Sequence, residues 1–219
     1  MRIHTRHSSV ATRATLAVVM AFVAGLACAP RARVLRGTPV PVRLPRAELA
    51  PGYRRLVFRW DYVDQAIAAR GEGVARIAAP DSVRLDFFLD GGMGSGFAIV
   101  VGDSVSTPGG DQARRYLPPV ALLWAALGRL AVPPAPDTVA KVDGDALRAD
   151  IGQNPTWRAT FASDRLIRLE RIVGGRRVEW VNRGEPDIRY QNERAARSLS
   201  LKITSSDDVA PFDPAIWRR

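Results

Sequence analysis

The stretch YRRLVFRWDYV at residues 53–63 carries the pattern that decides the fold. Its apolar side chains from Leu56 to Tyr62 stand at every second position, with Arg59 and Asp61 between them. Successive side chains of a β-strand point to opposite faces of the sheet, so this alternation indicates one buried and one solvated face. We therefore expect residues 53–63 to form a half-buried strand of an antiparallel sheet.

The same alternation recurs along the chain at residues 83–89, 157–161 and 199–203. Turn sequences rich in glycine, proline and aspartate separate the apolar runs, at residues 79–81, 90–92, 107–110, 143–145, 174–175 and 183–186. Such punctuation favours short strands joined by tight turns. The sequence predicts a mainly β (α+β) domain, with a strongly curved antiparallel sheet or half-barrel of roughly 9–11 strands.

One segment, PPVALLWAALGRL at residues 118–130, departs from this period. Pro118 and Pro119 suit the first turn of a helix, and Gly128 suits its end. The helix is apolar nearly all round, yet it is shorter than the roughly 20 residues that span a bilayer. We expect it to pack in or over the concave face of the sheet, with a ligand, a membrane or a loop covering its other side.

The amino terminus has the composition of an export signal. Arg2, Arg6 and Arg13 form a basic region without acidic residues, and an uncharged, mostly apolar run of 14 residues follows at positions 14–27. A run of this length is typical of the hydrophobic part of a secretory signal peptide. We expect residues 1–27 to be removed as a signal peptide.

The end of that run, Gly-Leu-Ala-Cys at residues 25–28, resembles the lipobox of bacterial lipoproteins. The resemblance implies cleavage after Ala27 and acylation of Cys28 with fatty acids such as palmitate, which would anchor the chain to a membrane. Gly25 is a departure, because the family usually has leucine there. A plain signal peptide followed by a chance cysteine, or a short membrane anchor, are the alternatives. Cys28 is the only cysteine, so no disulfide can form within the chain.

Residues 28–51 are rich in proline and arginine. Proline removes hydrogen-bond donors and favours an extended chain, so we interpret this stretch as a solvated tether between the lipidated cysteine and the domain. The alternative is a basic segment that contacts anionic lipid headgroups. The remaining residues, 52–219, are expected to form a single domain.

Two features of the composition exclude whole classes of function. His4 and His7 are the only histidines and both fall in the signal, so the mature chain lacks Ser-His-Asp catalysis and histidine-ligated metal sites. The net charge of +10 comes almost wholly from arginine, without the interleaved aromatic residues typical of nucleic-acid binding. We expect no cofactor, no metal, no nucleic acid and no enzymatic activity. A carboxylate-based hydrolase is the least favoured alternative.

The order of the expected elements resembles the lipoprotein-localisation (Lol) family, which comprises a soluble periplasmic carrier and a lipid-anchored outer-membrane receptor. The elements are strands at 53–63, 72–79, 83–89 and 95–101, a helix opening at 116–119, and a meander from about 138 to 204. The resemblance implies an open half-barrel that holds acyl chains, with helices acting as a lid. No long amphipathic helix precedes the first strand, which is a departure from the family, because Pro45 and Pro51 interrupt that stretch.

The lipobox favours the anchored, receptor-like branch of that family. Ala29 follows the cysteine and is compatible with sorting to the outer membrane, where the domain would face the periplasm. The resemblance thus implies a monomeric envelope lipoprotein that binds acyl chains or other lipoproteins in an apolar cavity, with a role in lipoprotein sorting. The alternative is a non-catalytic scaffold lipoprotein that uses the same sheet as a docking surface.

Acyl chains require a concave apolar lining without hydrogen-bonding groups. We expect eight large apolar side chains to provide it, namely Phe87, Leu89, Phe97, Ile99, Trp124, Leu127, Phe161 and Trp180. The alternative for each is ordinary packing in a core. In the glycine-rich loop at residues 90–96, Met93 is expected to be an exposed apolar tip that touches the membrane or the incoming acyl group, as the resemblance to the receptor branch implies.

Overall fold

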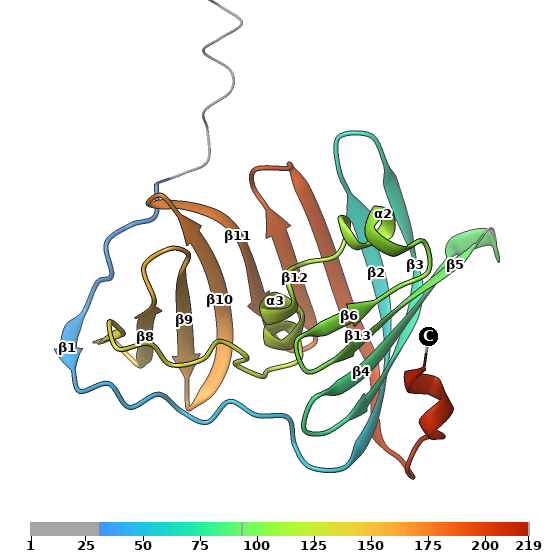
Figure 1. The fold of residues 1–219 in the computed structure, drawn as a ribbon, viewed down its shortest axis with the longest axis horizontal. Coiled ribbons are helices and arrows are strands. Elements are labelled where there is room, and N and C mark those ends of the chain that lie inside the picture. Colours follow the sequence, from blue (N-terminus) through green and yellow to red (C-terminus); the bar gives the residue numbers. More distant parts are fainter. Residues whose placement is uncertain (1–30, 93, 219) are drawn as a thin grey trace, which may run out of the picture. The chain divides into compact units, whose positions relative to one another are not determined.

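The computed structural model describes residues 31–92 and 94–218 of the chain, and within them thirteen strands form one antiparallel sheet (Figure 1). The strands are β1 (Thr38–Val40), β2 (Tyr53–Val63), β3 (Ala68–Ala78), β4 (Ser82–Leu89), β5 (Ser95–Val101), β6 (Ser104–Ser106), β7 (Val139–Asp143), β8 (Ala146–Ile151), β9 (Thr156–Ala162), β10 (Arg165–Val173), β11 (Arg176–Arg183), β12 (Asp187–Asn192) and β13 (Arg197–Asp208). The short helices are η1 (Asp90–Gly92), α2 (Gly110–Arg114), α3 (Val120–Ala126) and η2 (Pro214–Trp217).

The strand order is β1-β7-β8-β9-β10-β11-β12-β13-β2-β3-β4-β5-β6, so two meanders meet where β13 pairs with β2. The sheet stays open between its edge strands β1 and β6, and it curves around α3 (Figure 1). The predicted curved antiparallel sheet with an apolar helix on its concave face is confirmed. The strands outnumber the roughly 9–11 expected because β1 and β6, at three residues each, are too short to show a period.

The alternation in residues 53–63 is confirmed in β2. Leu56, Phe58 and Trp60 are buried on the concave face, whereas Arg59 and Asp61 are exposed. In the β4–β5 half of the sheet, Val83 and Val100 face each other across the ladder and are buried, and Ala98 and Ile99 beside Val100 are buried as well. The hydrophobic pattern therefore fixes which face of the sheet turns toward the helix.

Helix α3 seals the concave face. It begins after Pro119 and ends before Gly128, whose φ of +94° is a backbone conformation that favours glycine. Trp124 is 0% exposed, and its ring N–H donates to the carbonyl oxygen of Gly102 at 2.9 Å. Leu122 packs into the core cluster of the β7–β12 meander, and Leu123 packs into the cluster of the β2–β6 meander. One seven-residue helix thus joins both halves of the core.

The segment before β2 differs from the expected solvated tether. Leu35 is buried, and β1 pairs with β7 at the edge of the sheet. Residues 41–52, which we name the strap, then cross from β1 to β2 along one rim (Figure 1). In the strap, Leu44 and Leu49 pack against the core, and Ala47 accepts a hydrogen bond from Leu130 N–H at 2.9 Å. The apolar residues between the prolines hold this segment on the domain rather than in solvent.

Candidate ligand-binding site beneath helix α3

A small cavity of about 60 Å³ lies between α3 and the sheet. Its lining comes from β4, the turn before α3, α3 itself, and strands β11, β12 and β13. Of the described residues that line it, only Tyr190 has a polar side chain. Such a surface offers acyl chains contact without competing hydrogen-bonding groups.

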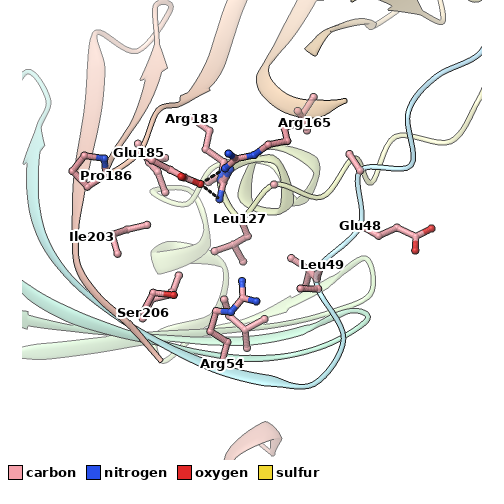
Figure 2. Close-up of a pocket in the computed structure, with 18 of the residues that line it drawn as sticks. Glu48, Leu49, Arg54, Leu127, Arg165, Arg183, Glu185, Pro186, Ile203 and Ser206 are labelled. Atoms are coloured by element: carbon pink, nitrogen blue, oxygen red, sulfur yellow. Dashed lines mark hydrogen bonds and ion pairs between the residues drawn. The ribbon is translucent and has the colours of Figure 1, made fainter. Parts of the chain in front are cut away.

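A larger pocket of about 530 Å³ opens at the carboxyl-terminal end of α3 (Figure 2). It shares Ala126, Leu127 and Ile188 with the small cavity, so the two hollows meet at one wall of apolar side chains. The strap forms one side of the pocket, and the turns after β9 and β11 form another. Its volume falls within the roughly 300–1,000 Å³ typical of small-molecule sites.

Three of the four arginines that line this pocket, together with a glutamate, surround its entrance. We name Arg54, Arg165, Arg183 and Glu185 the arginine mouth. The Glu185 carboxylate accepts from both Arg165 and Arg183, the latter at 3.2 Å. Arg54 pairs through Nε with Asp208 at 3.3 Å, and Figure 2 shows its guanidinium reaching into the pocket from β2. The entrance is therefore polar and cationic above an apolar floor.

Arg183 is the most confined of these cations. Its side chain is 21% exposed, and its buried Nε has no hydrogen-bond partner among the described residues. Burial lowers the pKa of Arg183, and the positive charges of Arg165 and Arg54 lower it further, although Glu185 opposes them. A desolvated guanidinium with an unused donor is a binding group for an anion.

A third pocket, of about 330 Å³, opens at the amino-terminal end of α3 and shares Leu117, Pro118 and Tyr190 with the small cavity. We name Arg115, Glu179, Tyr190 and Arg197 the glutamate mouth. Here the buried Glu179 carboxylate accepts from Tyr190 Oη at 2.9 Å and from Arg171 Nη1 at 2.7 Å. Burial raises the pKa of Tyr190, and the charge of Glu179 raises it further.

Of the eight predicted lining residues, the structure brings Phe87 and Leu127 to the small cavity. Phe87 also makes edge-to-face contacts with Phe58 and Trp60, with ring centroids 5.6 and 5.8 Å apart. Trp124 and Phe161 lie on the concave side but are fully packed in the core. For these two, ordinary core packing describes the observed position.

The other four predicted residues do not join them. Phe97 and Ile99 pair with Asp86 and Arg84 of β4, so they face the convex side of the sheet. Trp180 pairs with Glu170 on the convex side, where Arg168 stacks 4.4 Å from its ring centroid.

Leu89 shares the face of Phe87 but lies at the end of β4, where it is 37% exposed. Cys28 and Met93 fall outside the described residues, so lipidation and the membrane-touching tip stay predictions.

Several lining residues were not predicted. Leu85, Leu199 and Leu201 line the small cavity, and the alternation of their strands contained the signal, because each shares a face with a predicted apolar residue. The arginines of the mouth carried no such signal. They are distant in sequence and meet only through the pairing of the strands.

The fold and the site define an open antiparallel sheet with an apolar helix over its concave face. No protein-family model matches the sequence, and no curated protein is significantly similar to it. The similar solved structures include an outer membrane lipoprotein-sorting protein domain from Vibrio parahaemolyticus, 6% identical, with a TM-score of 0.46 over 76% of this chain and 89% of that chain.

A LolA superfamily protein from Nitrosomonas europaea is 8% identical, with a TM-score of 0.48 over 80% of this chain and 93% of that chain. A DUF1329 family protein from Desulfovibrio piger is 9% identical, with a TM-score of 0.41 over 77% and 90% of the two chains.

Within residues 31–92 and 94–218, no helix combines the length and the apolar character needed to cross a membrane.

Proposed function

We propose that this domain binds the acyl chain of a lipid or lipoprotein beneath α3, without catalysing a reaction. The observation that carries the proposal is the apolar wall that the floor of the 530 Å³ pocket shares with the cavity under the helix. Ala126, Leu127 and Ile188 belong to both hollows, so an acyl chain that enters the pocket meets no polar barrier before the cavity. Burial of its methylene groups would supply about 0.8 kcal/mol each.

Binding requires a movement of α3. The small cavity, at about 60 Å³, is far below the volume of an ordinary ligand site, so the chain must displace the helix or Leu127 as it enters. The sequence provides for such a movement, because Pro118-Pro119 and Gly128 flank a helix of only seven residues. In this proposal α3 is a lid that opens when the acyl chain replaces its contacts with the sheet.

We further propose that acylated Cys28 anchors the domain at the outer membrane, facing the periplasm. Ala32 N–H donates to the carbonyl oxygen of Gly175 at 2.9 Å, which ties the start of the described chain to the β10–β11 turn. Cys28 precedes Arg31 by three residues, which an extended chain spans in at most roughly 11 Å. The short reach supports a domain held close to the membrane from which it takes a ligand.

One observation favours a second function. Because the concave side holds a packed core, with Trp124 and Phe161 fully buried, the domain also suits a rigid scaffold lipoprotein that binds partner proteins on its surface. Protein docking on the surface does not require an apolar pocket with a cationic entrance, whereas acyl binding does. We therefore prefer the acyl-binding proposal. The two functions differ in whether lipid accompanies the purified protein.

Native mass spectrometry with lipid extraction tests the proposal on residues 28–219 carrying Cys28→Ser, which contain the whole compact unit Arg31–Arg219. We expect a lipid or acylated peptide to co-purify, or added lipopeptide to bind. A Leu201→Asp variant places a charge in the cavity wall and should lose the ligand, whereas Lys202→Asp on the opposite face of β13 should keep it. A ligand-free protein that also ignores added lipids would contradict the proposal.

A further inference from the structure

The charges of the arginine mouth do not balance among themselves. Arg165 and Arg183 share the single carboxylate of Glu185, which leaves one positive charge without a partner in the mouth. Arg54 is paired with Asp208 outside the pocket. Two cations on one carboxylate create a local positive potential at the entrance.

Two further acids line the pocket, and neither cancels that charge. Glu48 belongs to the strap, and in Figure 2 its carboxylate points away from the pocket. Asp164 is exposed in the turn between β9 and β10, where its φ of +61° is set by the turn. The unpaired positive charge of the arginine mouth therefore faces the 530 Å³ pocket.

The position of Arg183 links the surplus positive charge to a particular place in the pocket. Its Nε is buried and has no partner among the described residues, and the guanidinium carbon lies 3.5 Å from where a Cβ of Gly128 would stand. The side chain is thus held against the end of α3, with a donor that is unpaired but buried. A planar guanidinium matches the paired oxygens of a carboxylate or phosphate.

Next to the Arg183 guanidinium, the floor of the pocket is apolar. Its floor is formed by Leu49, Leu56, Ile77, Leu127, Leu166 and Ile203. A cationic rim over an apolar floor fits a molecule with the opposite distribution, namely an anionic group joined to a hydrocarbon chain.

We propose that the arginine mouth binds the carboxylate or phosphate of an anionic amphiphile whose acyl chain extends beneath α3. This inference rests on the acyl-binding function and narrows its ligand to fatty acids or lipids with a terminal phosphate. The anion binds the outer donors of Arg165 and the Nη groups of Arg183, and it reaches the buried Nε of Arg183 as the end of α3 moves. Glu185 does not block it, because that side chain is 56% exposed and can turn into solvent.

The experiment compares three ligands with the same acyl chain: a fatty acid, a lysophosphatidic acid and an uncharged monoacylglycerol. Their affinities are measured by calorimetry at pH 7 on the Cys28→Ser chain, residues 28–219. We expect both anionic ligands to bind at least about tenfold more tightly than the monoacylglycerol. The ratio between the fatty acid and the phosphate identifies which anion the mouth prefers.

Substitutions test whether the preference for anionic ligands comes from the arginine mouth. Arg183→Met keeps the apolar stem and should abolish the preference while changing the affinity for monoacylglycerol less than about twofold. Arg165→Gln, at an exposed position, should reduce the preference without affecting folding. Arg197→Met in the glutamate mouth is the matched control and should leave the preference unchanged.

The outcomes separate the two proposals. Equal affinities of the charged and uncharged ligands for the unsubstituted mouth would overturn the anionic headgroup and leave the acyl site standing. A preference that survives both Arg183→Met and Arg165→Gln would overturn the assignment to the arginine mouth. Failure of all three ligands to bind would overturn the acyl site and, with it, the headgroup.

Discussion

The two mouths at the ends of α3 contain the same kinds of residue but arrange them differently. In the glutamate mouth the buried carboxylate of Glu179 is matched by Arg171 and Tyr190, although Arg197 Nε is also buried without a partner among the described residues. In the arginine mouth two guanidiniums share one exposed carboxylate, and a buried donor of Arg183 is left over. The mouths thus differ in their carboxylates: a buried and fully matched carboxylate stabilises a fold, whereas an exposed one shared by two cations leaves positive charge for a ligand.

The largest difference should appear in stability. Glu179→Ala removes a carboxylate that is 3% exposed and leaves Tyr190 Oη and Arg171 without their acceptor, so we expect a loss of about 3 kcal/mol. Glu185→Ala removes an exposed carboxylate and should cost less than about 1 kcal/mol. Urea denaturation of both variants measures the contrast. Equal losses would remove the distinction between a structural and a binding mouth.

The second prediction concerns the wall between the pocket and the cavity. Ala126→Phe fills the space where the two hollows meet, so acyl affinity should fall at least about tenfold while the helix stays folded. Val142→Phe, at an exposed position of β7, is the control and should bind normally. Fluorescence titration with a labelled fatty acid reports both. An unchanged affinity for Ala126→Phe would place the acyl chain elsewhere.

Salt should separate the two contributions to binding. Raising the ionic strength to about 0.5 M screens the arginine mouth, so the affinity for a fatty acid should fall roughly two- to fivefold. The affinity for an uncharged monoacylglycerol depends on apolar burial and should not fall. Parallel titrations at low and high salt check this. A parallel fall for both ligands would argue against a specific anion site.

The smallest effect belongs to Tyr62, whose ring lies 6.0 Å from the guanidinium of Arg197 in the glutamate mouth. Burial and a 2.8 Å hydrogen bond to Asp64 raise the pKa of Tyr62 to about 12. The folded state favours the neutral phenol, so its contribution to stability is complete below pH 10 and is lost as the pH rises toward 12.

Tyrosinate absorbance, taken as the difference between the parent chain and Tyr62→Phe, reports this titration. A midpoint near pH 10 would show that Tyr62 is solvated and that this end of the sheet is looser than described.

The sequence predicted which face of a strand is buried where one face packs in the core and the other faces solvent. Residues 53–63 are such a case, and their alternation gave the correct face. The assignment of faces failed for β5. There Phe97 through Val100 are apolar at every position because the convex side is covered too. Arg84 stacks on Phe97 there and donates to Ile216 of η2, so no period remains to be read.

Trp180 misled for the opposite reason. Its neighbour Glu179 is the residue that faces the concave side, and the tryptophan lies between Arg168 and Arg177 on the convex side. Burial of a charged residue reverses the expected assignment of faces. The arginine mouth could not be predicted from the sequence, because Arg54 comes near Arg183 only through long-range strand pairing.

The most direct test of acyl binding beneath α3 is photo-crosslinking with a fatty acid that carries a diazirine near its methyl end, followed by peptide mapping. We predict saturable labelling of α3 and of the concave-face residues of β12 and β13, competed by unlabelled fatty acid and lost in Ala126→Phe. Labelling confined to exposed apolar residues, or labelling that no competitor reduces, would contradict an acyl site under the helix.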